Sequence, residues 1–171
     1  MISPSSPQNS PDSSIEDAAA AGKIIQLLAF LLSDEEYGID IRMVKEIIRL
    51  TEITRVPRAL SYIQGIISLR GTVLPIFDLR QLLSMPDSKL DKKSRILVVS
   101  LEAGLIGIIV DAVTEVLELN EAELEPAPAV MTNLEADHIK GLGRYKGRLI
   151  VFLDLEKVYQ ARHVQAKSVQ G

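Results

Sequence analysis

Apolar and polar positions alternate in short runs along most of the chain, which is the pattern of β-strands. In QLLAFLLSDEEYGIDI (26–41), two apolar runs are separated by SDEE, which predicts a hairpin with a polar turn. GIISL and TVLPIF flank Arg70-Gly71, which predicts a second hairpin in which Gly71 supplies a positive φ. The solid apolar runs GLIGIIV (104–110) and RLIVFL (148–153) are typical of strands that are buried on both faces.

Four aspartates lie at the boundaries of these runs, and one proline lies within a run. Asp40 and Asp111 each precede a further apolar run, so we expect a short turn or helical loop that leads into another strand. Pro75 cannot donate to a ladder, which predicts that its strand is an edge strand or is bulged. Asp78 and Asp154 precede leucines at helical spacing, which predicts two helices with aspartate N-caps.

The chain carries this pattern twice. Segment 38–50 aligns with 107–119, and segment 63–83 aligns with 139–159, with an insertion around 125–133. Gly65, Gly71 and Asp78 recur as Gly141, Gly147 and Asp154, so we assign these residues to turns and caps of the fold. The sequence therefore predicts a tandem duplication, with one small β-barrel in each copy (about 23–94 and 95–160).

The duplication also predicts the domain organisation. A copy of about 70 residues buries only a modest fraction of its surface, so it is marginal alone and two copies packed together form the domain, 23–160. Residues 1–22 are rich in serine and proline at their start, which predicts a disordered or weakly helical tail. Residues 161–171 are interpreted as the end of a C-terminal helix and a short tail.

Composition narrows the function classes. The 171 residues contain no cysteine, which excludes disulfides and thiolate metal sites and favours an intracellular location. The net charge is −4, whereas a nucleic-acid binder usually carries an excess of basic residues, so this class of function is disfavoured. Hydrophobic residues make up 47% of the chain, which argues against wholesale disorder.

A search for catalytic chemistry finds little. His138 and His163 have no second ligand at workable spacing, so surface histidines are the simpler interpretation, and no metal or other cofactor is expected. No phosphate loop, nucleophile elbow or zinc pattern appears in the sequence. A binding module is therefore favoured over a small-barrel enzyme or a nucleic-acid binder.

Glu46 and Arg70 are charges set among apolar residues. Such a charge fixes the orientation of a partner at an interface, while the apolar surround supplies affinity. The alternative is that strand alternation simply turns both side chains to solvent. Glu46 recurs as Glu115 and Arg70 as Lys146, which suggests that part of the pattern serves the barrel itself. The residues alone leave both interpretations of Arg70 open.

Several stretches, in order, resemble the CheW family of bacterial chemotaxis coupling proteins: YGIDIRMVKEII, ITRVP, IQGIISLRGTVLPIFDLR, GIIVDAVTEVL, EPAP and IKGLGRYKGRLIVFLDLEKV. The resemblance runs from about Gln26 to Tyr159. Its most specific parts are YGIDI, the Gly-Arg-Gly-Pro-Asp-Leu run from Gly65 to Leu79, and the V-D-x-V-x-E-V-L run of the second copy. The family often has Asn where Ser68 stands, so any hydrogen bond made by that amide is not carried over.

The resemblance implies a mainly β fold of two intertwined five-stranded SH3-like β-barrels, with short helices and a C-terminal helix. It also implies a non-enzymatic cytoplasmic adaptor, or scaffold, that is recruited to membrane receptor arrays. Its partners would be the regulatory domain of a CheA-type histidine kinase and the cytoplasmic domain of methyl-accepting chemoreceptors. An equivalent adaptor in a related sensory array, controlling pili or gliding, remains the alternative.

The family binds receptors in a groove between its two barrels. The residues that the resemblance carries over to this groove are Ile41, Val44, Glu46, Ile67, Leu69, Arg70 and Val113, the last being the repeat partner of Val44. The resemblance also favours a partner-facing Arg70 over a merely solvent-facing one. Kinase-docking positions do not fall on a comparable motif, so none is assigned.

Overall fold

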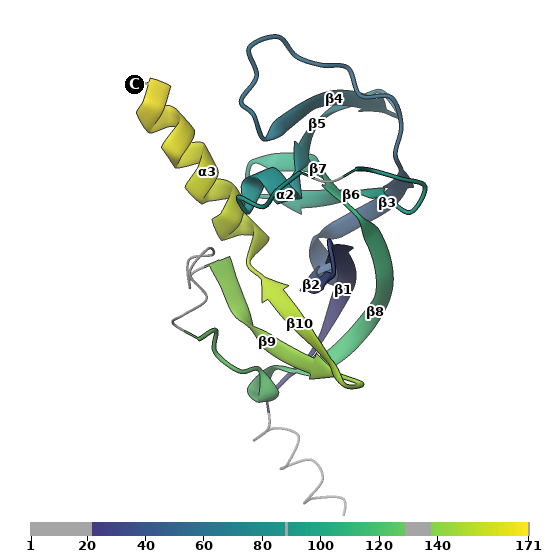
Figure 1. Cartoon of the computed structure of the whole chain (residues 1–171), viewed down its shortest axis with the longest axis vertical. Helices are drawn as coiled ribbons and strands as arrows, with labels where there is room; N and C mark the ends of the chain where they lie inside the picture. The colour runs from purple at the N-terminus through teal and green to yellow at the C-terminus, as the bar shows by residue number, and fades with distance from the viewer. Residues whose placement is uncertain (1–21, 88, 129–137, 171) are drawn as a thin grey trace, which may run out of the picture.

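The computed structural model describes residues 22–87, 89–128 and 138–170, with side chains up to residue 162, and consists mainly of two five-stranded sheets (Figure 1). The first sheet, barrel A, has the order β8 (Ala112–Asn120), β1 (Ile24–Leu32), β2 (Glu35–Asp40), β10 (Arg148–Leu153) and β9 (Ile139–Tyr145). The second, barrel B, has the order β3 (Val44–Arg49), β6 (Arg95–Leu101), β7 (Gly104–Val110), β5 (Thr72–Asp78) and β4 (Ile63–Leu69). The remaining elements are the short turns η1 (Ile41–Met43) and η2 (Glu121–Glu123) and the helices α2 (Leu79–Leu82) and α3 (Leu155–Gln170). The predicted mainly β fold of two intertwined five-stranded barrels is confirmed.

Each barrel takes strands from both sequence copies. Barrel A combines β1 and β2 of the first copy with β8, β9 and β10 of the second, and barrel B combines β3, β4 and β5 with β6 and β7. The copies pair through the antiparallel ladders β1–β8 and β3–β6 and through the parallel pairs β5–β7 and β2–β10. In the parallel pairs, Ile76 lies opposite Gly107 in barrel B and Ile150 opposite Glu36 in barrel A. The sheets therefore differ from the expected division at residues 94 and 95, because each copy exchanges strands with the other.

Local predictions agree largely with these elements. η1 precedes β3, as expected after Asp40, and Asp111 forms a one-residue bend between β7 and β8, without a helical turn. β5 is not an edge strand, since it lies between β7 and β4, and the irregularity in its pairing with β4 lies on β4 between Ile63 and Gly65, away from Pro75. Pro75 is tolerated there because the registered pairing of β5 with β7 begins one residue later, at Ile76.

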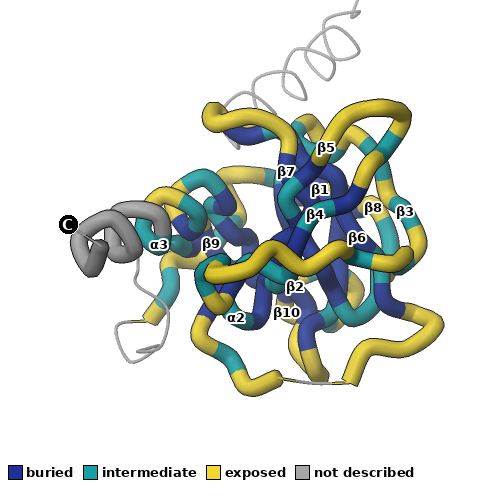
Figure 2. The backbone as a smooth tube through the Cα atoms, turned by 90° about the horizontal axis from the view of Figure 1, so that it is seen from above, coloured by how far each residue is buried: buried dark blue, intermediate teal, exposed yellow. Residues whose placement is uncertain are grey.

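Buried side chains form three cores. The central core lies between the barrels, and each barrel has a smaller core of its own. Leu28 and Phe30 of β1 contribute to the central core, whereas Leu27 and Ala29 face the core of barrel A, so both faces of this strand are buried. The predicted burial of β7 and β10 is confirmed by their patterns, and Figure 2 shows the buried strands at the centre with exposed loops around them.

Helix α3 links the end of barrel A to barrel B. Its residues Leu155 and Val158 are part of the central core, and the Tyr159 ring packs edge-on against Phe77 of β5 at 5.6 Å between centroids. The Arg162 guanidinium donates to the carbonyl oxygen of Leu82 at 3.0 Å and so caps α2. The second helix of the sequence prediction therefore braces the two barrels against each other.

Three expectations lie outside the described residues. They concern the tail over residues 1–21, part of the insertion (129–133), and the side chain of His163.

Candidate partner-binding surface

The β4–β5 turn consists of Arg70 and Gly71, with φ values of 50° and 81° and with Leu69 opposite Thr72. Two consecutive positive φ values define the hairpin turn whose twist matches that of the strands. The β9–β10 turn repeats it, with φ values of 50° at Lys146 and 80° at Gly147. The predicted roles of Gly71 and Gly147 are confirmed, and the preceding basic residue also belongs to the turn.

The structure brings Arg70 and Glu46 together as an ion pair. Glu46 lies on β3 and Arg70 at the β4–β5 turn, and the Arg70 guanidinium donates to both carboxylate oxygens, one of them at 3.2 Å. This hydrogen bonding with Glu46 raises the pKa of Arg70 above its usual value. The Arg70 side chain is 71% exposed and that of Glu46 is 29% exposed, so the pair lies at the surface and keeps donors and acceptors available.

Barrel A has a corresponding pair with a different partner. Glu115, the repeat equivalent of Glu46, accepts a hydrogen bond from Arg148 at 2.6 Å. Lys146, the equivalent of Arg70, instead places its Nζ 5.2 Å from the ring centre of Tyr145. Arg148 is 40% exposed and also lies 3.6 Å from the largely buried Glu36. A glutamate–arginine pair is thus common to both barrels, and the arginine of the barrel B pair, Arg70, is the more exposed of the two.

The predicted apolar contacts do not form one exposed surface. Ile41, Val44 and Val113 are partly buried and pack against the central core. The part of each side chain that remains exposed therefore lies along the junction of the barrels. Leu69 is partly buried against the core of barrel B. Ile67 differs from the prediction, since its side chain is only 6% exposed and lies in that core. Strand alternation turns Ile67 inward, so it supports the hairpin and does not offer a contact surface.

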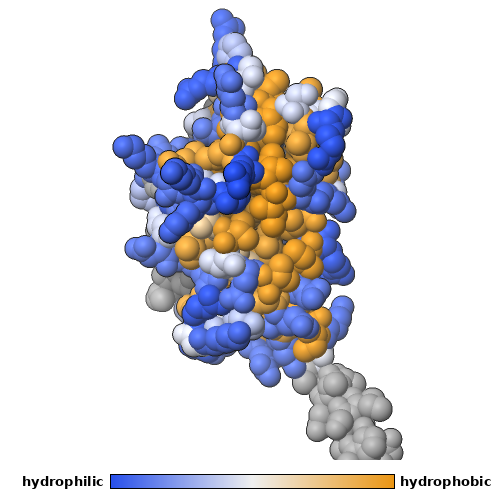
Figure 3. Space-filling model, turned by 90° about the vertical axis from the view of Figure 1, so that its right-hand side faces the viewer, coloured by the Kyte–Doolittle hydropathy of each residue, from blue (hydrophilic) through white to orange (hydrophobic). Residues whose placement is uncertain are grey.

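Sequence reasoning missed two apolar residues on the edge strands. Ile47 on β3 is 42% exposed and Val116 on β8 is 50% exposed. They occupy equivalent positions in the two copies, which is the signal that would have identified them. Figure 3 shows a continuous apolar stripe, flanked by hydrophilic side chains, on the face that carries β3 and β8 at the right of Figure 1. A stripe of this kind on a folded surface is typical of protein–protein contact sites.

Two of the predicted structural glycines allow a close approach of backbones. A β-carbon on Gly65 would lie 2.2 Å from the carbonyl oxygen of Thr54, and one on Gly141 would lie 3.0 Å from Cβ of Leu124. Each close approach lies next to an isolated β-bridge. Thr54, which follows β3, pairs with Ile66 beside Gly65, and Glu125, which follows η2, pairs with Leu142 beside Gly141. The two glycines therefore occupy equivalent places in the two barrels, but only Gly65 combines the close approach with a positive φ, 148°.

The predicted helix caps are both present. The carboxylate of Asp78 accepts a hydrogen bond from the Arg80 amide at 2.9 Å, and that of Asp154 accepts one from the Lys157 amide at 3.1 Å. Burial raises the pKa of Asp78, partly opposed by the hydrogen bond from the backbone of Arg80. Both aspartates therefore act within the fold as helix caps.

Within the described ranges, no group of three or more His, Cys, Asp and Glu side chains is placed to hold a metal ion. No helix in the same part of the chain combines the length and apolar character needed to cross a membrane. What the surface offers is an apolar stripe that includes Ile47 of β3 and, on the other face of the same strand, the Glu46–Arg70 ion pair with free hydrogen-bonding capacity. Both features are suited to contact with another protein.

Comparison with known proteins gives consistent results. A family model described as the CheW-like domain matches residues 26–163. "Chemotaxis protein CheW" of Klebsiella aerogenes is 33% identical over 139 residues, covering 81% of this chain and 84% of the relative. The protein of the same name from Rhizobium meliloti is 31% identical over 141 residues, covering 82% and 91%. The crystal structure of the scaffolding protein TtCheW from Thermoanaerobacter tengcongensis matches with a TM-score of 0.73 and 32% identity, covering 80% of this chain and 92% of that one.

Proposed function

This chain belongs to the CheW-like family, and from that membership we infer that it is a chemotaxis adaptor that couples chemoreceptors to a CheA-type histidine kinase. The structural relative TtCheW is itself a scaffolding protein, which supports the same role here. The adaptor binds the cytoplasmic domains of receptors and the regulatory domain of the kinase, and it has no catalysis of its own. Its binding to receptors recruits it from the cytoplasm to membrane receptor arrays.

One observation carries the receptor-binding part of this proposal: the Glu46–Arg70 pair lies on the barrel whose edge strand β3 also exposes Ile47. Apolar contacts supply affinity, and the two opposite charges select the orientation of a partner that presents charges of its own. The residues that we propose as receptor contacts are Ile41, Val44, Glu46, Leu69, Arg70 and Val113, extended by Ile47 and Val116. Ile67 supports these residues from within the barrel B core.

Signalling imposes a further requirement on these contacts. Coupling between receptor and kinase needs interactions that differ between the signalling states, because equal affinity for both states transmits nothing. An exposed ion pair meets this requirement, since the guanidinium can exchange Glu46 for a carboxylate of the partner at little net cost. The pair is thus proposed as the polar part of the receptor contact.

The test is reconstitution of the three proteins: this chain, a CheA-type kinase and a receptor cytoplasmic fragment from the same organism. We expect the wild-type chain to bind both partners and to raise kinase autophosphorylation in the presence of receptor. Val116→Asp should weaken receptor binding and leave kinase binding intact. Failure of the wild-type chain to bind either partner would overturn the proposed function.

A further inference from the structure

Two arginines face each other at one end of barrel B. Arg49 of β3 lies directly opposite Arg95 of β6 in the antiparallel register. Lys92 joins them around an open hollow of about 660 Å³ that is also lined by Leu50, Asp91 and Ser94. Like charges directly opposite each other destabilise a sheet, so this arrangement calls for a compensating anion.

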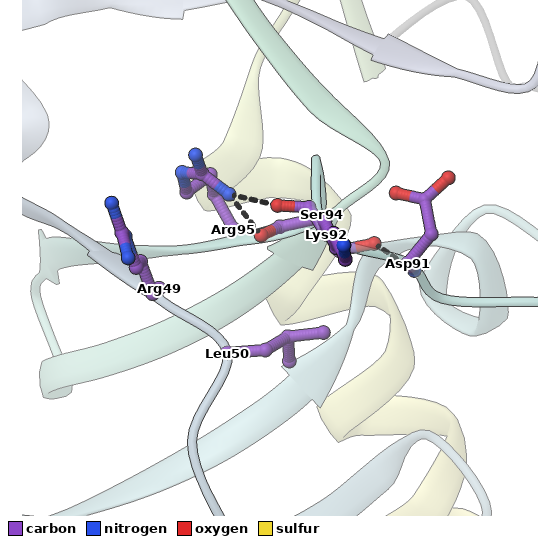
Figure 4. Close-up of a pocket in the computed structure, with 6 residues that line it drawn as sticks. All are labelled: Arg49, Leu50, Asp91, Lys92, Ser94 and Arg95. Carbon is purple, nitrogen blue, oxygen red and sulfur yellow. Dashed lines mark hydrogen bonds between the residues drawn. The ribbon is translucent and has the colours of Figure 1, made fainter.

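The described part of the chain supplies no such anion. None of its salt bridges involves Arg49, Lys92 or Arg95. Asp91 lines the hollow, but its carboxylate accepts from the Lys93 amide and lies across from the two guanidinium groups in Figure 4.

The hydrogen bonds of Arg95 fix its side chain at the hollow. Its Nη1 donates to the carbonyl oxygens of Lys92 at 2.7 Å and Ser94 at 2.8 Å, as the dashed lines in Figure 4 show. The rest of the guanidinium fork remains available to a carboxylate, which it can bind through two parallel hydrogen bonds.

The fold itself does not need basic residues at these two positions. In the other copy, the positions equivalent to Arg49 and Arg95 are Glu118 and Gln26, which also lie directly opposite each other, between β8 and β1. One barrel therefore closes in the same register without a basic pair, so the pair serves another purpose.

The basic pair continues the apolar stripe. Ile47 lies opposite Leu97, a residue of the central core, so Ile47 projects on the side of β3 that faces the barrel junction. Arg49 is two residues further along the same strand and shares that face. The stripe over β3 and β8 thus runs into a cluster of positive charge at the barrel B end, where Arg49, Lys92 and Arg95 gather.

We propose that this cluster orients the receptor segment bound on the stripe, by accepting acidic side chains that lie beyond one end of the apolar face of an amphipathic helix. This inference rests on the proposed receptor-binding function. The helix lies along β3 with its apolar residues on Ile47 and Val116 and its acidic end over Arg49 and Arg95. Reversing the helix places the acidic end away from the cluster, which disfavours that orientation.

The experiment is a titration of the full chain with a receptor cytoplasmic fragment from the same organism, at two salt concentrations. The double variant R49E/R95E should bind on the order of tenfold more weakly at low salt and lose most of the salt dependence. The matched control is Lys157→Glu, a charge reversal on exposed α3 away from the stripe, which should bind like wild type. If R49E/R95E folds poorly, Arg49→Gln serves instead, and it should not lower the melting temperature, since it removes a like-charge contact.

The outcomes separate this inference from the proposed function. If Ile47→Asp abolishes receptor binding while R49E/R95E binds like wild type, the adaptor role stands and the orienting role of the cluster is overturned. If neither variant changes receptor binding, the stripe is not the receptor surface, so the orienting role and the proposed contact residues both fail, while the adaptor role stands as long as wild type binds both partners. If inorganic phosphate at constant ionic strength displaces the receptor fragment from wild type as readily as from R49E/R95E, the cluster does not bind carboxylates of the partner, and the orienting role is again overturned.

Discussion

The guanidinium of Arg80 forms an ion pair with the carboxylate of Asp111, and this pair ties helix α2, which follows β5 of barrel B, to the junction of β7 and β8. The Arg80 side chain is 3% exposed and also donates to the carbonyl oxygen of Pro86 at 3.0 Å. Asp111 in turn accepts from the amide of Ser33 in the β1–β2 turn at 2.6 Å. One buried charge pair therefore connects three segments that are distant in sequence and belong to both barrels.

Removing either partner of this pair should destabilise the fold, but by different amounts. Asp111→Leu leaves the Arg80 charge buried without its counterion, which we expect to cost about 3 kcal/mol or more. Arg80→Met keeps the volume and leaves Asp111 with the Ser33 amide and partial contact with water, so its cost should be clearly smaller. Urea denaturation of both variants measures the difference. If both variants lost the same free energy of unfolding, the cost would come from breaking the ion pair and not from leaving the Arg80 charge buried without a partner.

The glycines at positions 65 and 71 should respond differently to alanine. Gly71 has a φ of 81° and open space around it, so Gly71→Ala incurs only backbone strain, about 1 kcal/mol. Gly65 has a φ of 148°, and its added β-carbon would also collide with the Thr54 backbone. Gly65→Ala should therefore cost several kcal/mol or prevent folding. Thermal unfolding checks the order, and a Gly65→Ala protein as stable as the Gly71→Ala protein would contradict the close approach.

Arg70 allows stability and binding to be separated. Asn-Gly is a preferred pair for a turn with two positive φ values, so Arg70→Asn should keep or raise the melting temperature. The same change removes the guanidinium, so receptor affinity should fall. Arg70→Glu should weaken receptor binding and kinase activation further, with a nearly unchanged melting temperature, because an exposed ion pair contributes little to stability. A large fall in melting temperature for either variant would make Arg70 a structural residue.

A charge swap tests whether the ion pair acts internally or on a partner. E46R/R70E restores opposite charges between β3 and the β4–β5 turn, so unfolding should resemble that of wild type. Receptor binding should remain weak, because each charge then meets the wrong sign on the receptor. Recovery of full binding by the double variant would indicate that the pair only shapes the hairpin.

Local chemistry predicted much of this fold. Gly71 and Gly147 in the turns, and Asp78 and Asp154 at the helix starts, follow from rules that involve only near neighbours along the chain. The pairing of strands does not, because β5 and β7 belong to different copies and their backbones are far apart in sequence. An alternating pattern identifies a strand, but it does not say which copy supplies the strand beside it.

The binding surface shows the same division. The sequence identified Glu46 and Arg70 as unusual charges but did not pair them, because β3 and the β4–β5 turn approach each other only when barrel B closes. Repeat alignment makes Lys146 the equivalent of Arg70 in the second copy. The residue that forms the ion pair with Glu115 is instead Arg148, two residues later. Ile67 was expected at the receptor groove because the family resemblance carries it over, and motif resemblance alone does not distinguish the two faces of a strand.

Asp78 makes stability depend on pH in a defined direction. Burial raises its pKa in the folded state above the ordinary value, so the folded state binds a proton more tightly than the unfolded state. The resulting stabilisation is complete below the ordinary pKa of an aspartate and is lost as the pH rises through the raised pKa. At neutral pH the native state therefore carries the cost of a partly buried charge.

Asp78→Asn removes this charge and keeps an oxygen that can accept from the Arg80 amide, so the variant should be at least as stable as wild type at pH 7. As the pH falls through the acid range, wild type gains its proton and the asparagine variant does not, so the difference should move in favour of wild type. Asp78→Ala is the control for the cap alone and should be less stable than the asparagine variant by about 1 kcal/mol at every pH. Urea denaturation at pH 7 and at acid pH measures all three proteins. A stability difference between wild type and Asp78→Asn that does not change with pH would contradict the raised pKa.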